Sequence, residues 1–340
     1  MGIDMVMIAQ AMVDGYAKVD NTFLARNGLV PGGAKVVSPK DAGRLEAEVA
    51  GMTHASTLRG KEPGGMSYVA GGSAANTAIT MGMLGAHVAF FGPTGNDDAG
   101  IVFHNDMASA GILCFHPTIP GGATGRCLVF VPPGGDRSMV ASPGISGEIA
   151  GEEVIAGMCG HARLCFCEGF LFSYPGAVSV MKAAAEAARS GGGQVVMSLG
   201  AAWCAAANRD AMRDFMENRA DIILGNEGEL MALYGTQDLQ QAVRMLMASG
   251  KTAAITRGGE GAFVISGGVL HIIPPPEAEV VDTTGAGDNF AAGFLYGLLD
   301  GLSPQHAGRC GAALAGEAIS HVGARPQRNP RQVLGPVLQP

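Results

Sequence analysis

Two carboxylates and two glycines stand close together in the stretch Asp282-Thr283-Thr284-Gly285-Ala286-Gly287-Asp288. The residues before it are apolar and β-prone, and apolar residues recur at helical spacing from 289 to 299, so the stretch predicts a strand-turn-helix joint. Such a joint binds anions, because the first amides of a helix lack partners, the dipole is positive there, and glycines let a ligand approach. Asp288 would repel a phosphate at this position, which is understandable if its carboxylate accepts a proton. The alternative is a first-turn aspartate that only complements the helix dipole.

Two further motifs place polar side chains at expected helix starts. Gly71-Gly72 precedes a helix predicted over 73–84, in which Asn76 carries donors and acceptors suited to hydroxyl groups. Asn226-Glu227-Gly228-Glu229 opens a helix after a predicted strand at 221–224. Both motifs also have purely structural interpretations, since paired glycines punctuate chains and an N-x-x-E spacing forms a capping box.

In their order and spacing, the three motifs resemble those of the ribokinase family, also called the PfkB carbohydrate and nucleoside kinases. The resemblance implies phosphoryl transfer from ATP to a hydroxyl group, with Asp288 as the general base. The amides of Gly285, Ala286 and Gly287 would hold the developing negative charge. The acceptor would be bound by groups from the amino-terminal third of the chain, namely Asp14, Gly71, Gly72, Ser73 and Asn76.

The same resemblance assigns residues to the nucleotide and its ions. Thr256-Arg257-Gly258-Gly259-Glu260-Gly261 is similar to a family turn beside the nucleotide, so ATP would contact Asn226, Thr256, Gly258, Gly261 and Thr284. Mg²⁺ on the phosphates would be organised through water by Asn226 and Glu229, in keeping with its reluctance to lose water. In many relatives a monovalent cation binds near the position of Asp282 and the loop around Gly323, which makes Asp282 a candidate for K⁺ activation.

Within the family, three short stretches resemble adenosine-kinase-like members: Asp136-Arg137-Ser138, Ala11-Met12-Val13-Asp14 and Glu168-Gly169-Phe170. Arg137 would close from a lid onto the transferring phosphoryl group, and the alternative is an exposed arginine without a role. Phe170 or Phe172 would stack on a nucleobase, although aromatic residues at this spacing are more often part of a core.

The acceptor implied by these stretches is a primary hydroxyl of a ribonucleoside. A free sugar such as ribose or fructose is the alternative. Ala9-Gln10 stands where relatives tend to carry Gly-Asn near the pocket floor, and this departure leaves the exact acceptor open. A non-catalytic sugar or nucleoside sensor is a third interpretation, against which the presence of Asp288, Asn226 and Glu229 argues.

Composition and charge exclude several classes of protein. The 340 residues are 47% hydrophobic with a formal net charge of −8, and the only cation-rich stretch is short and lies near Arg325 and Arg328, so no nucleic-acid partner is expected. The first apolar residues are too few to span a membrane and lack a basic export signal, so no membrane partner is expected either. Seven cysteines without C-x-x-C spacing indicate reduced thiols in the cytoplasm rather than a metal site.

Strands and helices alternate regularly after residue 150, which predicts a parallel sheet with helices on both faces. The predicted strands are 162–167, 194–198, 221–224 and 252–256, the predicted helices are 177–189, 208–218, 227–234 and 239–248, and a hairpin follows at 262–273. A further strand at 5–9 would end just before Asp14, at the sheet edge where open α/β sheets bind ligands. The fold class expected is therefore a three-layer α/β/α sandwich with a mostly parallel central sheet.

Short alternating pieces between 16 and 38 and between 114 and 140 predict strands outside the central sheet. In the family such strands form a small β lid over the active site, and the same surface often builds a homodimer. We expect a core of residues 1–12, 41–112 and 145–340 and a lid of residues 13–40 and 113–144. A helix is expected at 41–52 and a loop at 53–66.

Overall fold

A computed structural model describes residues 2–52, 66–116, 118–133 and 137–338, so most of the loop expected at 53–66 lies outside the described residues. Within those residues, nine strands form a large sheet in the order β14-β13-β12-β11-β10-β9-β1-β5-β6. The sheet is parallel from β12 to β6, and β13 and β14 add antiparallel pairs at one edge. The strands are β1 (Met5–Ile8), β5 (Val88–Phe91), β6 (Leu113–Cys114), β9 (Leu164–Cys167), β10 (Gln194–Ser198), β11 (Ile222–Asn226), β12 (Thr252–Thr256), β13 (Ala262–Ser266) and β14 (Val269–Ile273).

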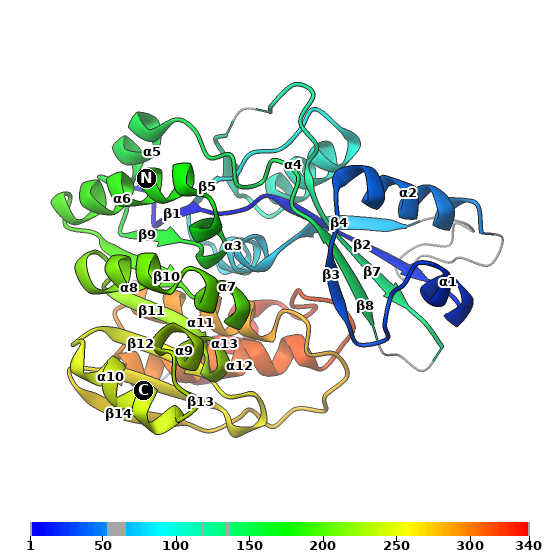
Figure 1. Ribbon diagram of the computed structural model, residues 1–340. Helices are drawn as coiled ribbons and strands as arrows, with labels where there is room; N and C mark the ends of the chain where they lie inside the picture. Colours follow the sequence, from blue (N-terminus) through cyan, green and yellow to red (C-terminus); the bar gives the residue numbers. More distant parts are fainter. Residues whose placement is uncertain (1, 53–65, 117, 134–136, 339–340) are drawn as a thin grey trace.

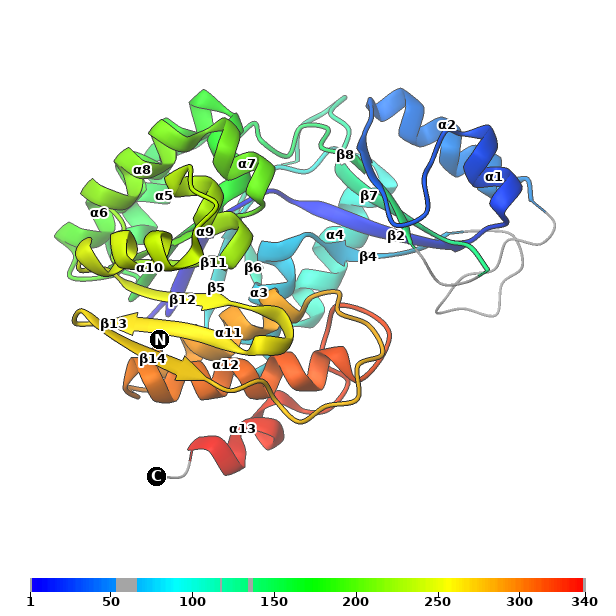
Figure 2. The ribbon, with the colours of Figure 1, turned by 60° about the horizontal axis from the view of Figure 1, so that its bottom comes forward.

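Helices cover both faces of the large sheet (Figures 1 and 2). In β1, Val6 and Ile8 pack into one hydrophobic layer and Met5 and Met7 into the other, as expected for strands buried on both sides. One face carries α5 (Glu152–Cys159), α6 (Pro175–Ser190), α7 (Ala202–Ala207), α8 (Arg209–Asn218), α9 (Glu227–Tyr234) and α10 (Leu239–Ala248). The other carries α3 (Ser73–Met83), α4 (Asp98–Ser109), α11 (Ala286–Leu299) and α12 (Pro304–Ile319), with α13 (Pro330–Leu338) packed outside α12. The predicted three-layer sandwich is confirmed.

A second, five-stranded sheet stands to one side of the sandwich, at the right of Figure 1. Its order is β3 (Ala34–Val36), β8 (Ser138–Ser142), β7 (Gly125–Val131), β2 (Met12–Lys18) and β4 (Ser67–Gly71). The helices α1 (Asn21–Arg26) and α2 (Pro39–Ala50) cover one of its faces, where Phe23 and Leu45 pack with Phe130. The predicted small sheet is therefore present, and we call it with its two helices the small layer.

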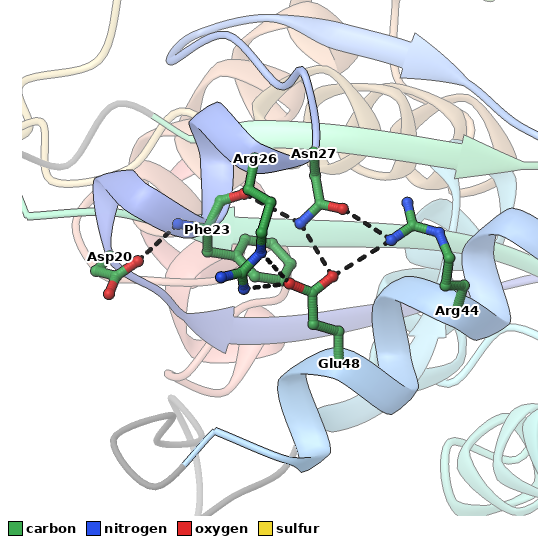
Figure 3. Close-up of polar contacts among 6 residues, drawn as sticks. All are labelled: Asp20, Phe23, Arg26, Asn27, Arg44 and Glu48. Atoms are coloured by element: carbon green, nitrogen blue, oxygen red, sulfur yellow. Dashed lines mark hydrogen bonds and ion pairs between the residues drawn. The ribbon is translucent and has the colours of Figure 1, made fainter.

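Polar side chains tie the two helices of the small layer together (Figure 3). Glu48 of α2 accepts hydrogen bonds from Arg26 Nε at 2.7 Å, Asn27 Nδ2 at 3.1 Å and Arg44 Nη1 at 3.3 Å. Asp20 caps α1 by accepting from the amide of Phe23 at 2.7 Å. Both arginines are more than half exposed, so the cluster orients the helices and adds little to stability.

Several boundaries differ from those predicted. Both β4 and α2 belong to the small layer, whereas Leu113–Cys114 pairs with β5 at the edge of the large sheet. The helix α1 replaces one of the strands expected between 16 and 38. Asp14 follows the first central strand, as predicted, but lies inside β2 of the small sheet instead of in a turn. These differences arise from pairings between strands far apart in the chain, which local periodicity does not specify.

No strand leads into α11, contrary to the predicted strand-turn-helix joint, because the described residues 274–285 carry none. Val280 and Val281 are 63% and 52% exposed, so the apolar character of this stretch does not reflect burial in the sheet. Helix α11 itself begins at Ala286, as the sequence predicted.

Glycines let α11 and α12 pack backbone against backbone. A Cβ at Gly293 would lie 2.6 Å from the carbonyl oxygen of Cys310, and one at Gly311 would lie 2.7 Å from that of Phe290. A Cβ at Gly297 would lie 2.9 Å from the Cα of Ala307. The helix that begins at the central motif is therefore fixed by contacts that leave no room for a side chain.

None of the helices in the described residues is both long and apolar enough to cross a membrane.

Candidate active site

Three cavities meet at the amino terminus of α11, beside residues that end the parallel strands or follow them. One of about 410 Å³, here called the aromatic cavity, is lined by Asp14, Asn76, Glu168, Phe170, Tyr174 and Trp203, among others. A central cavity of about 120 Å³ is lined by groups that include Asn226 and Glu229. An apolar cavity of about 390 Å³ follows. Asp288 and Ser73 line both the aromatic and central cavities, and Gly287 and Thr256 line both the central and apolar ones, so the three cavities adjoin one another in a row, here called the path.

The carboxylate of Asp288 is held by two side chains of α3. Ser73 Oγ donates to Oδ1 at 2.6 Å and Asn76 Nδ2 donates to Oδ2 at 2.9 Å. Burial raises the pKa of Asp288 above its usual value, and the bonds from Ser73 and Asn76 offset only part of that rise. A carboxylate with a raised pKa that faces a cavity is suited to accept a proton.

The turn before α11 has the shape expected of an anion site. Gly285 caps the helix at φ 76°, and a Cβ there would lie 2.3 Å from the carbonyl oxygen of Ala324, so only glycine fits. The amide of Ala286 donates to the carbonyl of Thr283 at 3.2 Å, whereas Gly287 is exposed and lines two cavities. The positive end of the helix dipole therefore faces the centre of the path.

Asp282, at the other end of the same motif, is bound by the protein itself. Its Oδ1 accepts from the amide and the hydroxyl of Thr284 at 3.0 and 2.7 Å, and its Oδ2 accepts from the amide of Gly323 at 2.8 Å. Arg137 of the small layer lies 2.8 Å from the same Oδ2 and donates to Thr284 Oγ1 at 2.7 Å. Burial alone would raise the pKa of Asp282, but the bonds from Arg137, Gly323 and Thr284 outweigh it and hold the pKa below its usual value.

In addition to Asp288, the buried carboxyl groups of Asp14 and Glu168 line the aromatic cavity. Burial and the negative charge of Asp288 raise the pKa of Asp14 to about 7. Burial also raises the pKa of Glu168 to about 7, although this carboxylate accepts from the amide of Gln10 at 2.7 Å. A Cβ at Gly71 would lie 2.1 Å from Cγ of Asp14, so the glycine provides the space that this side chain occupies. Near neutral pH these groups can both donate to and accept from a ligand hydroxyl.

An aromatic pair lines the same cavity. Phe170 is half-buried with its ring centroid 6.0 Å from that of Trp203, which is 63% exposed. Phe172 instead lies in the core, edge-on to Phe215 at 5.5 Å. The structure thus brings Phe170 to the cavity and excludes Phe172. Sequence reasoning missed Glu168 and Trp203 as site residues; the signals were the position of Glu168 after a buried strand and the presence of a single tryptophan in the chain.

Asn226 and Glu229 form the capping box of α9, which was the structural interpretation of their spacing. The amide of Glu229 donates to Asn226 Oδ1 at 2.9 Å, and the amide of Asn226 donates to Glu229 Oε2 at 3.0 Å. Burial raises the pKa of Glu229 to about 7. Both residues also line the central cavity, and their oxygen atoms are the ligand type that a hard divalent cation prefers, so the residues present fit such an ion.

The predicted nucleotide residues separate into two groups. Thr256, Gly258 and Gly261 line the apolar cavity, and Asn226 lines the central one. Thr284 lines neither of these cavities. Its amide and hydroxyl donate to Asp282, and its hydroxyl oxygen accepts from Arg137.

Comparison with known proteins identifies this arrangement. The pfkB family carbohydrate kinase profile matches residues 43–331. The chain belongs to the PfkB carbohydrate kinase family. It is 30% identical to the ribokinase of Haemophilus influenzae over 269 residues, which cover 77% of this chain and 85% of that protein.

Solved structures match this PfkB kinase over its whole length. The crystal structure of a probable sugar kinase from Rhizobium etli has a TM-score of 0.86 at 30% identity and covers 99% of each chain. The adenosine kinase from Sinorhizobium meliloti has a TM-score of 0.84 at 30% identity, again over 99% of each chain. The PfkB kinase is therefore a phosphotransferase with a hydroxyl acceptor, and membership implies ATP as donor with a metal ion that is typically Mg²⁺.

Proposed function

We propose that the chain transfers the γ-phosphoryl group of ATP to the 5′-hydroxyl of a ribonucleoside. The observation that carries the proposal is the two-sided lining of the aromatic cavity around Asp288. Asp14, Asn76 and Glu168 offer hydrogen-bonding groups suited to ribose hydroxyls, whereas Phe170 and Trp203 offer ring faces suited to a planar base. A free sugar would use only the polar groups.

In this proposal Asp288 is the general base. Its carboxylate accepts the proton of the acceptor hydroxyl, while Ser73 and Asn76 hold it in position. Gly285, Ala286 and Gly287 present the positive end of α11 to the charge that develops on the transferring group. Mg²⁺ when bound neutralises phosphate charge, and Asn226 and Glu229 would hold it through its waters. ATP itself would contact Asn226, Thr256, Gly258 and Gly261. Thr284, which the sequence also assigned to the nucleotide, lines neither the central nor the apolar cavity and is bonded to Asp282 and Arg137 instead.

Arg137 enters the proposal in two ways: as a positive charge beside the turn before α11, and as a competitor of any cation that binds Asp282. Its guanidinium is anchored on Asp282 and Thr284, which brings a fixed positive charge from the small layer to the turn before α11. K⁺ activation through the Asp282 region belongs to the same proposal, with the condition that a cation at this carboxylate competes with Arg137. Gly71 and Gly72 complete the acceptor site by making room for Asp14 and by opening α3.

A sugar such as ribose or fructose is the second candidate acceptor, favoured by the hydrogen-bonding wall of the aromatic cavity and by the likeness to a ribokinase. A non-catalytic sensor is a weaker candidate, because Asp288 and Glu229 both face the path. We also propose that the enzyme works in the cytoplasm and dimerises through the small layer, where Val36 and Met139 are 65% and 43% exposed.

The test is a screen of acceptors with ATP and Mg²⁺. Adenosine, guanosine, cytidine, ribose and fructose are compared by release of ADP, and the product is identified as a 5′-phosphate by NMR. Trp203→Ala should raise KM for the preferred nucleoside roughly 2- to 12-fold, the worth of one aromatic contact, and leave turnover of ribose unchanged. Repeating the assay in K⁺ and in a bulky organic cation tests the monovalent cation, and equal kcat in both would count against it. Turnover of ribose or fructose with none of any nucleoside would overturn the proposed acceptor.

A further inference from the structure

The side chains that line the apolar cavity include almost none that can hydrogen-bond the edge of a base. The only hydrogen-bonding side chains in its lining, within the described residues, are the hydroxyls of Thr256 and Thr283; the rest are glycines, prolines, alanines and the side chains of Val280, Phe290 and Ile319. A hydroxyl both donates and accepts. It therefore serves an amino group and a carbonyl group on a purine equally well.

Charged groups close to the cavity are turned elsewhere. The guanidinium of Arg257 stacks over the ring of Phe263 at 4.3 Å and lies 3.5 Å from a carboxylate oxygen of Glu227. Glu277 and Glu279, on the loop beside Pro276, are exposed and do not line the cavity. No fixed charge of the described residues is thus aimed at a bound base.

The walls are made by small residues that leave flat apolar surfaces. A Cβ at Gly316 would lie 2.6 Å from Cβ of Pro276, so the glycine lets the proline segment rest on α12. Ala312 and Ala315 of the same helix line the cavity, and Val280 beside it is 63% exposed. Such walls hold a ring by its faces, and every purine has the same faces.

We infer that the enzyme uses GTP and ITP as phosphoryl donors alongside ATP. This rests on the proposed function, in which the donor base occupies the apolar cavity. A pocket whose side chains form no hydrogen bond with the distinguishing group separates analogues by about 10- to 200-fold in kcat/KM at most. A site that does hydrogen-bond this group rejects the analogue by about 10⁴- to 10⁵-fold. Pyrimidine triphosphates serve less well, because the smaller ring buries less apolar surface.

The experiment compares kcat/KM for ATP, GTP and ITP at a saturating concentration of the acceptor found in the screen. Values within about 100-fold of one another support the inference. A larger preference for ATP overturns it.

Binding of non-hydrolysable AMP-PNP and GMP-PNP, measured by calorimetry, separates this inference from the proposed function. Dissociation constants within about 100-fold of each other, with ribose or fructose phosphorylated from both donors and no nucleoside phosphorylated, would leave the inference standing and defeat the proposed acceptor. Turnover with ATP at more than about 100 times the efficiency of GTP would do the reverse.

A variant checks that the base lies in this cavity. Ala315→Phe fills the space and should weaken AMP-PNP and GMP-PNP binding by a similar factor of at least about tenfold, the loss of a buried ring surface. Ala183→Phe, at an equally half-buried alanine of α6, should bind both analogues as wild type does. Unchanged binding by Ala315→Phe with an unchanged Tm would overturn the inference.

Discussion

Asp282 and Asp288 stand six residues apart in one motif, and the protein surrounds them differently. Asp282 receives the amide of Gly323, the amide and hydroxyl of Thr284 and the guanidinium of Arg137, and its pKa falls. Burial raises the pKa of Asp288, and its two neutral side-chain donors offset only part of that rise. A carboxylate bonded by charged and backbone donors, like Asp282, is suited to hold neighbouring segments together. A carboxylate with fewer donors beside a cavity, like Asp288, stays basic enough to accept a proton from a ligand.

The largest effect should come from Asp288→Asn, which keeps the size of the side chain and removes the base. Loss of a general base typically lowers kcat by about 10²- to 10⁴-fold. We expect a fall near the upper end of this range, because the same residue also positions the acceptor. Binding of AMP-PNP should persist or tighten slightly, since a carboxylate that repels the γ-phosphate is gone. If Asp288 only complemented the helix dipole, the variant would lose about 0.3–1 kcal/mol of stability and little activity. A kcat within tenfold of wild type, measured beside Tm and the AMP-PNP dissociation constant, would defeat the assignment.

Asp282→Ala should affect stability first. It leaves the buried amide of Gly323 without its acceptor and Arg137 without its counter-charge, and each orphaned buried donor costs about 1–3 kcal/mol. Urea unfolding should therefore report a loss of at least this size, with a smaller fall in kcat than for Asp288→Asn. Glu277→Ala, an exposed acid on the preceding loop, is the control and should unfold as wild type does. An unchanged free energy of unfolding for Asp282→Ala would contradict its role as an anchor.

The smallest effect should be a pH dependence of stability with opposite signs for the two kinds of carboxyl group. Asp14, Glu168 and Glu229 have pKa values raised to about 7, so the folded chain binds more protons than the unfolded one and stability is lost as pH rises toward 7. Asp282, with its lowered pKa, loses its contribution only as pH falls below the usual range for aspartate. We therefore expect Tm of the ligand-free protein to fall between about pH 5 and 7, less steeply in Glu168→Gln. A Tm that rises over this pH interval would contradict the raised pKa values of Asp14, Glu168 and Glu229.

Local patterns in the sequence predicted the elements that carry Asp288. Apolar spacing from Phe290 to Leu298 gave α11, and the glycine pair before Ser73 gave α3, because these signals depend on residues within one or two turns. The stretch at 277–281 misled the prediction, since Val280 and Val281 are apolar without being in a strand.

Contacts between residues far apart in the chain could not be predicted from the sequence. Arg137 and Thr284 are 147 positions apart, and nothing local in either stretch signals that they bond. Asp14 was expected after a central strand because β1 ends nearby, but β2 continues into a different sheet through pairing with β4 and β7. The motifs thus pointed to several residues that line the cavities around Asp288, whereas only the tertiary structure shows that Ser73 and Asn76 of α3 bond Asp288 and that Trp203 lies beside Phe170.

The glycines between α11 and α12 have a consequence for how substitutions in this protein would be interpreted. Gly293, Gly297 and Gly311 line none of the three cavities of the path, yet any side chain there must push α11 away from α12 and carry Asp288 with it. In a mutational scan scored by growth or turnover, these interior positions would therefore rank with the residues that touch the ligand. A map of tolerated substitutions alone would therefore extend the apparent active site about two helical turns along α11, into the protein interior.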